Sequence, residues 1–461
     1  MNPRDEHTSP ATSTDVVLRR GPFFAVLLQG LPLAIGLASH ALINLVDLAI
    51  VGRLGDDAVQ AAHIGSTWNF LPMILGQCVS TALLAQLSQR IGLQQHDKAR
   101  GYNVRAQWFM VWLGLAVSLL TALPAAWQVD QTGVTGTVRA DAIHYLVVSN
   151  LGCIAMFVLM QTTAAMRAAG EAWMPLVLLL SANVLNLGLD FVLMFGWEAL
   201  GIPAIGVAGA AYASVSSRLL ASVFAVLWLR RRKHQLSLRG PRATKPEPVA
   251  APLLHDAWPQ AVQITLRAAI VIALTILVQQ RFGDDATVSL GITTRLDSLI
   301  LFASLGFANA ATAYSGRAVA AGLHKNARLA GMWAAVQAMV FGALFLWFYL
   351  EQGETLVTWF LPEPSARVVE LTMIYFGIAA WGQLLGAGAL GAIGAVYGAG
   401  QMIVPMLVDV VCFAICFAVL WWVSSDATAL TTFYWALVIG MAVVLLGQLL
   451  LIAFGRWART A

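Results

Sequence analysis

The sequence is poor in charged residues and in cysteine. Of its 461 residues only 11% are Asp, Glu, Lys or Arg, whereas 59% are hydrophobic. A soluble protein carries about 25% charged residues, and so few charges could not cover the surface of a soluble fold this large. The formal net charge of +4 comes from basic residues in short loops, which indicates membrane topology and excludes nucleic acid as a partner.

The four cysteines, Cys78, Cys153, Cys412 and Cys416, all lie in apolar stretches. No CxxC or Cys/His ligand spacing is present, so neither a disulfide framework nor a zinc site is predicted. The sequence also lacks HExxH, GxSxG and an aspartate-rich metal motif in a loop. We therefore expect a protein that is not an enzyme and that needs no cofactor.

Twelve apolar segments are long enough to cross a bilayer as helices, which takes about 20 residues each. They cover residues 22–51, 63–88, 106–128, 139–166, 172–197, 204–229, 257–281, 287–316, 330–351, 367–396, 402–424 and 430–454. The first follows a polar stretch like a signal n-region, but no small-residue cleavage pattern follows, so we expect it to be retained. The predicted fold is an all-α integral membrane protein with twelve transmembrane helices in two six-helix lobes.

A polar, basic stretch divides the chain into halves. It begins at Arg230-Arg231-Arg232-Lys233. The expected organisation is a tail at 1–20, an N-terminal lobe at 21–230, a linker at 231–252, a C-terminal lobe at 253–455 and a tail at 456–461. Basic loops fall on one side of the predicted membrane, and most acidic loops fall on the other. By the positive-inside rule, both termini and the linker are cytoplasmic in a multi-pass protein of the inner (cytoplasmic) membrane.

The two halves resemble each other. Gly55-Asp56-Asp57-Ala58 recurs as Gly283-Asp284-Asp285-Ala286, and His96–Arg100 lies over His324–Arg328 at the same offset of 228 residues. A second correspondence places Ala169-Gly170 over Ala399-Gly400 at an offset of 230. Six helices separate the copies, so both halves enter the membrane in the same orientation. Parallel repeats of this kind are typical of alternating-access transporters.

Two polar stripes interrupt apolar segments of the first half. One comprises His40, Asn44 and Asp47, and the other comprises Asn183, Asn186 and Asp190. Their spacing places each set on one helix face. A carboxylate in the hydrocarbon core costs a few kcal/mol (about 2.5–3.5 on insertion scales) and usually faces a bundle interior or an aqueous cavity. The stripes therefore predict a site that binds and releases a cation.

The repeat provides an internal control. The counterparts of Asn44 and Asp47 are Ile272 and Thr275, and those of Asn186 and Asp190 are Cys416 and Leu420. The second half keeps none of these polar groups, so the carboxylates are specific to the first lobe. The alternative is that the amides only bond neighbouring helices, and His40 is open between a bundle contact and a proton relay.

The second half has charged residues of its own inside apolar segments, namely Arg267, Arg295, Asp297 and Asp409. Arginine and aspartate can pair and neutralise each other in a membrane, so structural pairing is one interpretation. A role in coupling or substrate binding is the other. Arg218 is placed near the end of the sixth segment and interpreted as snorkelling toward the cytoplasmic interface.

Several short motifs together resemble the multidrug and toxic compound extrusion (MATE) transporters. They are Val46-Asp47, Val51-Gly52-Arg53-Leu54-Gly55, Arg167-Ala168-Ala169-Gly170 with Pro175, Asn186-x3-Asp190, Gly206–Ala211, Gly291-Ile292 with Arg295, and Gly398-Ala399-Gly400 with Pro405. The likeness covers essentially the whole chain. It implies an exporter of two six-helix lobes that moves small amphipathic or cationic organic compounds in exchange for H+ or Na+.

Within the family, the sequence most resembles the DinF-like branch. That likeness implies a cation site formed by Asp47, Asn186 and Asp190, with Ser214 at a position where threonine is expected. If the ion is Na+, the same three residues with Ser214 are the expected ligands, whereas His40 beside Asp47 favours H+. The NorM-like branch carries acids on its seventh and tenth helices, and the corresponding segments here lack them.

Two alternatives differ in function. A lipid-linked oligosaccharide flippase of the same superfamily should carry more cationic residues in its cavity and additional helices, and a membrane enzyme should show a catalytic motif. For the substrate cavity of an exporter, the sequence suggests Trp68, Asn69, Asn150, Gln161 and Met166, each of which could equally be a packing residue. We expect the protein to act as a monomer in the lipid bilayer.

Overall fold

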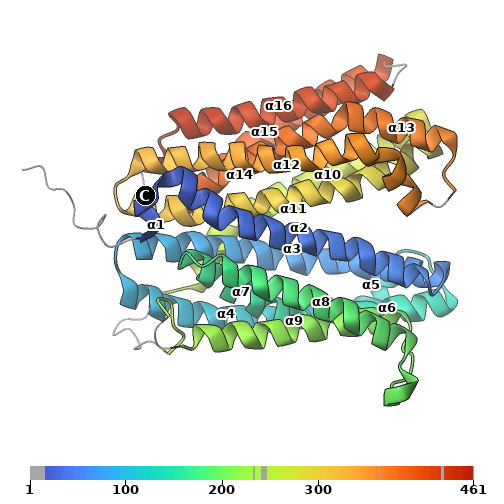
Figure 1. The fold of residues 1–461 in the computed structure, drawn as a ribbon, viewed down its shortest axis with the longest axis horizontal. Coiled ribbons are helices and arrows are strands. Elements are labelled where there is room, and N and C mark those ends of the chain that lie inside the picture. The colour runs from blue at the N-terminus through green and yellow to red at the C-terminus, as the bar shows by residue number, and fades with distance from the viewer. Residues whose placement is uncertain (1–15, 232–233, 240–246, 362, 427–429, 460–461) are drawn as a thin grey trace, which may run out of the picture.

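The computed structural model describes residues 16–231, 234–239, 247–361, 363–426 and 430–459, and these form a bundle of long helices (Figure 1). The first half contains α1 (Val16–Arg19), α2 (Gly21–Gly52), α3 (Asp56–Gly92), α4 (His96–Ala122), α5 (Ala125–Asp130), α6 (Gly136–Leu151), α7 (Cys153–Ala168), α8 (Trp173–Phe195), η2 (Glu198–Leu200) and α9 (Val207–Leu229). The second half contains α10 (Ala250–Phe282), α11 (Asp284–Ala320), α12 (His324–Phe360), α13 (Ala366–Gly377), α14 (Ala379–Gly398), α15 (Ile403–Asp426), α16 (Leu430–Phe454) and η3 (Trp457–Arg459).

The twelve predicted spans are confirmed. Eleven stretches of the described chain are long and apolar enough to cross a membrane, with α6 and α7 counted as one, and α15 adds an apolar stretch over Ile403–Val419. Several helices extend beyond the apolar segments: α3 begins at Asp56, where the sequence suggested 63. Asp56 and Asp57 occupy its first turn, where carboxylates favour the positive end of the helix dipole.

The helix bounds reproduce the repeat. Helices α3 and α11 are both 37 residues long and start at the equivalent residues Asp56 and Asp284. The fourth span of each half is broken, between α6 and α7 at Gly152 and between α13 and α14 at Ile378. We name the two halves the N-lobe (α2–α9) and the C-lobe (α10–α16). The lobes lie one above the other in Figure 1, with α2 and α3 next to α11.

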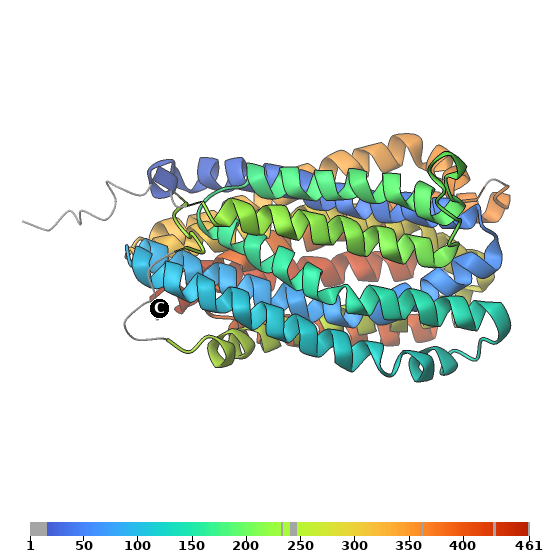
Figure 2. The same ribbon diagram turned by 90° about the horizontal axis from the view of Figure 1, so that it is seen from below.

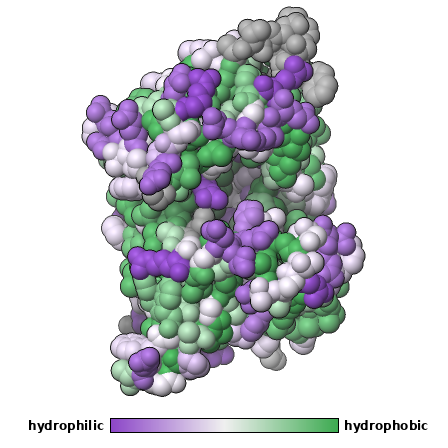
Figure 3. Space-filling view, turned by 90° about the vertical axis from the view of Figure 1, so that its right-hand side faces the viewer, coloured by the Kyte–Doolittle hydropathy of each residue, from purple (hydrophilic) through white to green (hydrophobic). Residues whose placement is uncertain are grey.

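The two ends of the bundle differ. Helix α1, the C-terminal η3 and the described part of the linker lie together at one end, here called the linker end (Figure 1). Helices α5 and α13 lie at the opposite end, here called the far end. Figure 2 shows the N-lobe helices running side by side between the two ends. Seen from the far end, the molecule is hollowed between its halves, with hydrophilic side chains around the hollow (Figure 3).

The linker is packed onto the N-lobe. Leu236 is fully buried in the N-lobe core, and Asn103 of α4 donates a hydrogen bond of 2.9 Å to its carbonyl oxygen. Arg100 donates likewise to the carbonyl of Gln235 at 3.0 Å. Further along, Glu247 forms a 2.9 Å ion pair with Arg90 of α3. These contacts hold the connection between the lobes against the linker end of the N-lobe.

The lobes meet closely where α2 crosses α11. A Cβ built on Gly306 of α11 would lie 2.3 Å from the backbone nitrogen of Ala34 in α2. Only glycine permits this approach of two backbones, so this crossing depends on the absence of a side chain. The crossing fixes α2, which belongs to the N-lobe by sequence, against the C-lobe.

Gly306→Ala is expected to lower the free energy of unfolding by about 1–3 kcal/mol, because the added methyl group must push α2 away from α11. Thermal unfolding of the purified protein in detergent measures the effect. Gly188→Ala in α8 is the matched control, since its Cβ would meet no atom within 4 Å. That control is expected to be neutral or to stabilise by up to about 1 kcal/mol. Equal unfolding temperatures for the two variants would contradict the close-packing interpretation.

Candidate functional site

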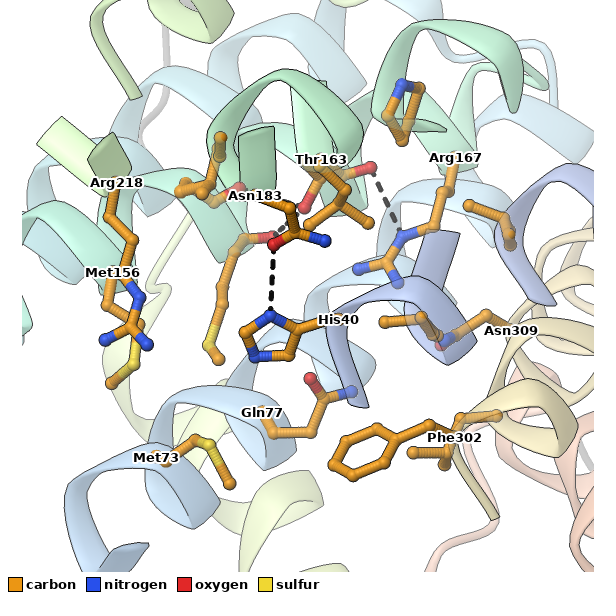
Figure 4. A pocket seen from close by; sticks show the side chains of 18 of the residues that line it. His40, Met73, Gln77, Met156, Thr163, Arg167, Asn183, Arg218, Phe302 and Asn309 are labelled. Carbon is orange, nitrogen blue, oxygen red and sulfur yellow. Dashed lines mark hydrogen bonds between the residues drawn. The ribbon is translucent and has the colours of Figure 1, made fainter. Parts of the chain in front are cut away.

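A cavity of about 170 Å³ lies inside the N-lobe and reaches the C-lobe (Figure 4). Its walls are largely apolar, and C-lobe residues Phe302, Leu305 and Asn309 of α11 close one side. The polar residues of its lining are His40, Gln77, Thr163, Arg167, Asn183, Asn186, Ser217, Arg218 and Asn309. The cavity therefore sits at the lobe interface, where a rocking motion would alter its shape.

The two predicted carboxylates meet beside this cavity. Helices α2 and α8 pack together, and the carboxyl groups of Asp47 and Asp190 lie within hydrogen-bonding reach of each other. Asp190 is 1% exposed, and no described donor reaches either of its oxygens or Oδ1 of Asp47. Two carboxylates this close repel each other unless a proton or another cation lies between them. The structure thus brings together the two acids that the sequence placed on separate helices.

The predicted amides flank the acids. Asn186, one turn before Asp190 on α8, donates from Nδ2 to Oγ of Ser214 on α9 at 3.4 Å. The ring of His40 lies edge-to-face against Phe302 of the C-lobe wall, with the two centroids 6.4 Å apart. Its Nδ1 lies 3.3 Å from Oδ1 of Asn183. Both stripes therefore contribute to one site, and His40 and Asn183 connect them. Asn44 differs, because its side chain is exposed and does not line the cavity.

Arg218 occupies a different position from the one expected. It lies at the middle of α9, whose bounds are Val207 and Leu229, too far from either end to snorkel. Its side chain lines the cavity, and Figure 4 shows it across from Arg167 with His40 between them. Its positive charge acts on both His40 and Asp47. A lone arginine at the centre of an apolar segment was the sequence signal for this cavity residue.

The five suggested substrate contacts do not line the cavity. Asn69 donates to Asn150 at 3.0 Å, and Gln161 donates to Asn103 at 2.7 Å, so these amides bond to one another between N-lobe helices. Met166 is fully buried in the N-lobe core, and Trp68 packs against an apolar cluster with Val129 and Met194. Their positions support the packing interpretation. Met73, Gln77, Met156 and Phe302 line the cavity instead, and no periodic signal distinguished them in the sequence.

In the C-lobe, Arg267 and Asp409 form the ion pair that the sequence allowed. Nη2 of Arg267 lies 2.8 Å from Oδ2 of Asp409, whose side chain is fully buried. Gln263 and Gln448 donate to the same carboxylate at 3.1 and 2.6 Å. The charge of Asp409 is thus neutralised and all its oxygens are bonded, which supports the structural interpretation of this pair.

Arg295 and Asp297 do not pair. The side chain of Arg295 is exposed and lines a groove between α2 and α12, whereas Asp297 is buried and accepts a hydrogen bond from the hydroxyl of Tyr375. Two residues apart on a helix, their side chains leave its axis in nearly opposite directions. Pairing between them was therefore excluded by the helical geometry.

Asp409→Leu is expected to lower the free energy of unfolding by about 3 kcal/mol or more, because it leaves Arg267 and two amides without their partner. The double variant Arg267→Met with Asp409→Leu removes both charges and is expected to recover most of that loss. Chemical denaturation in detergent measures both. If the double variant were less stable than Asp409→Leu, the two charges would not act as a pair.

Comparisons with known proteins agree with this architecture. The MatE family model matches residues 32–192 and again 259–423, once in each lobe. The probable multidrug resistance protein NorM of Agrobacterium fabrum is 27% identical over 319 residues, and the match covers 66% of this chain and 65% of that protein. The chain thus spans just under two thirds of the length of that curated relative. The NorM of Deinococcus radiodurans is 26% identical, with 88% of each chain covered.

Solved structures show the same fold. One, described as an outward-facing conformation of a multidrug resistance MATE family transporter of the MOP superfamily, has a TM-score of 0.87 at 19% identity and 98% coverage of both chains. Another, a MATE in complex with MaL6, has a TM-score of 0.84 at the same identity and coverage. The family model covers both lobes and most of the chain. The chain therefore belongs to the MatE family, that of the MATE transporters, which are not enzymes.

Proposed function

We propose that this protein exports small amphipathic organic compounds in exchange for H+ or Na+. Its family membership supports transport, and its relatives named as multidrug resistance proteins support this class of substrate. The cavity walls are mostly apolar, and their charged members are arginines. Such a lining suits substrates with an aromatic or aliphatic part and discriminates little among their other groups.

The acid pair carries the proposal. Asp47 and Asp190 lie side by side without a described donor, next to a cavity at the lobe interface. A cation that binds between them removes their repulsion, so each state of the site favours a different packing of α2 against α8. Since α2 also packs against α11, that change can reach the C-lobe. The site is therefore suited to couple cation binding to movement of the lobes.

The ligands available differ for the two ions. A proton needs only the two carboxyl groups, and His40 nearby offers a route for it. Sodium would add the amide oxygen of Asn186 and the hydroxyl of Ser214, both hard oxygen ligands. We propose H+ as the first ion to test, because the carboxyl groups already lie within reach of a shared proton. Asn44, exposed and outside the cavity, is proposed to have no part in the site.

The transport cycle follows from the two-lobed fold. Substrate occupies the cavity when the acids are deprotonated and Arg218 acts as their counter-charge. Cation uptake from outside neutralises the acids, repacks α2 and α8, and expels the substrate. The lobes then rock to expose the cavity on the other side of the membrane.

Orientation, branch and oligomeric state complete the proposal. The linker end is proposed to face the cytoplasm, because the basic loops gather there, in the inner membrane. The first-lobe acid pair supports a DinF-like coupling site, although the relatives above are named NorM. A cavity enclosed by both lobes of one chain supports a functional monomer.

Reconstituted transport of a fluorescent organic cation under imposed pH or Na+ gradients tests the proposal. Asp47→Asn and Asp190→Asn are each expected to reduce gradient-driven transport at least about fivefold, because they abolish the ionisation that links the two processes. Asp57→Asn, an exposed acid in the first turn of α3, is the matched control and should transport normally. Retention of gradient-driven transport by both site variants would show that coupling lies elsewhere.

A further inference from the structure

The linker end of the lobe interface is closed by two helices that are equivalent in the repeat. Helices α3 and α11 approach each other there so closely that a Cβ on Gly316 would lie 2.9 Å from Cβ of Ser88. A Cβ on Gly92 would lie 2.5 Å from the carbonyl oxygen of Arg317. Ser88 and Gly316 are related by the 228-residue offset of the repeat, so the crossing lies on the pseudo-twofold axis.

Each of these helices also caps a helix of the other lobe. Gln89 of α3 donates from Nε2 to the carbonyl oxygen of Gly398 at 2.8 Å, and Gly398 is the last residue of α14. Arg317 of α11 donates from Nη2 to the carbonyl oxygen of Ala168, the last residue of α7. The last carbonyls of a helix have no partner within it. Both bonds therefore satisfy helix ends across the lobe interface.

The two caps are copies of one another. Gln89 and Arg317 are related by the 228-residue offset, and Ala168 and Gly398 by the 230-residue offset of the later helices. Two residues after the end of each capped helix lies a glycine with a positive φ, 89° at Gly170 and 78° at Gly400. A Cβ on Gly400 would lie 3.2 Å from Nε2 of Gln89, and one on Gly170 would lie 3.5 Å from Nη2 of Arg317. The small helix ends thus make room for the capping side chains.

We propose that Gln89 and Arg317 are paired positioning residues for transport, which hold the lobes together at the linker end while the far end is open. The inference rests on the proposed rocking of the lobes. For the cavity to open at the linker end, α3 and α11 must separate, and both caps must break together. Water can then bond to the freed carbonyl oxygens. The caps therefore shift the equilibrium toward the closed linker end but still allow it to open.

The two caps differ in strength. Arg317 carries a positive charge against the negative end of the α7 dipole, and a hydrogen bond from a charged donor contributes more than one from an amide. Gln89 supplies an uncharged donor to α14. We therefore expect Arg317 to contribute more than Gln89 to the free energy that keeps the linker end closed, although the geometry of the two sites is the same.

Distances between spin labels at Lys98 and Lys325 measure this closure without substrate or Na+ and at one fixed pH. Both residues are exposed in the first turns of α4 and α12 at the linker end. The four natural cysteines are first replaced. Gln89→Met keeps the side-chain length and removes the donor, and Arg317→Met removes the charged donor and leaves an unbranched apolar side chain. The population with separated lobes is expected to rise about fivefold for Gln89→Met and more than about tenfold for Arg317→Met.

Arg328→Met is the matched control. Arg328 also caps a helix end, with Nη2 2.6 Å from the carbonyl oxygen of Gly455 after α16, but the bond stays within the C-lobe. Its loss is expected to lower the unfolding temperature and leave the distance distribution unchanged. Arg317→Lys, which keeps a cation, should shift the distances less than Arg317→Met.

The proposal is overturned if neither methionine variant at the interface changes the distance distribution. It is also overturned if Arg328→Met shifts the distances as far as Arg317→Met, since loosening of the fold would then explain both. Because the measurement requires no transport, its outcome is independent of whether Asp47 and Asp190 couple the cycle. The two proposals can therefore fail separately. The Asp47 and Asp190 variants can lose gradient-driven transport while the Gln89 and Arg317 variants leave the label distances unchanged, and the opposite result is equally possible.

Discussion

The cost of a charge in hydrocarbon governs the interior of this protein. Each buried carboxylate described above lies beside a cation, a hydroxyl donor or another carboxyl group. Asp409 is paired with Arg267 and held by two amides, and that arrangement stabilises the C-lobe. Asp47 and Asp190 have each other but no described donor, and this pair is the part of the molecule that we propose responds to a cation. The two sites differ in their hydrogen bonds: both oxygens of Asp409 are bonded, whereas neither oxygen of Asp190 has a described donor.

In the proposed cycle, the duplicated architecture links cation binding at the acid pair to movement of the lobes. Helices α3 and α11 begin at equivalent residues and have the same length, and they cross at the linker end where Gly316 faces Ser88. Polar function has diverged between the copies, because the acids lie at the cavity of one lobe only. The helix-end contacts are present in both copies, because Gln89 and Arg317 cap equivalent helix ends. In the proposed cycle, the N-lobe binds the coupling cation, and the equivalent helices of both lobes close the linker end.

The residues that line the cavity came from several parts of the chain. His40, Asn183 and Asn186 were predicted from helical spacing, since a polar stripe in an apolar segment must face something other than lipid. Trp68, Asn69, Asn150, Gln161 and Met166 carried no such pattern, and the structure places them among N-lobe helices. The interpretation of Arg218 as snorkelling is wrong, because the residue lies at the middle of α9 and its side chain lines the cavity.

The sequence by itself determined the membrane class, the twelve helices, the repeat and the two polar stripes, because these follow from hydropathy, period and internal similarity along the chain. Only the tertiary structure decided that the stripes meet, that Arg267 pairs with Asp409 and that Tyr375 donates a hydrogen bond to Asp297. It also decided that Gln89 and Arg317 reach across the lobes. Such contacts depend on how helices distant in sequence are rotated and offset against each other, and no local pattern of residues carries that information.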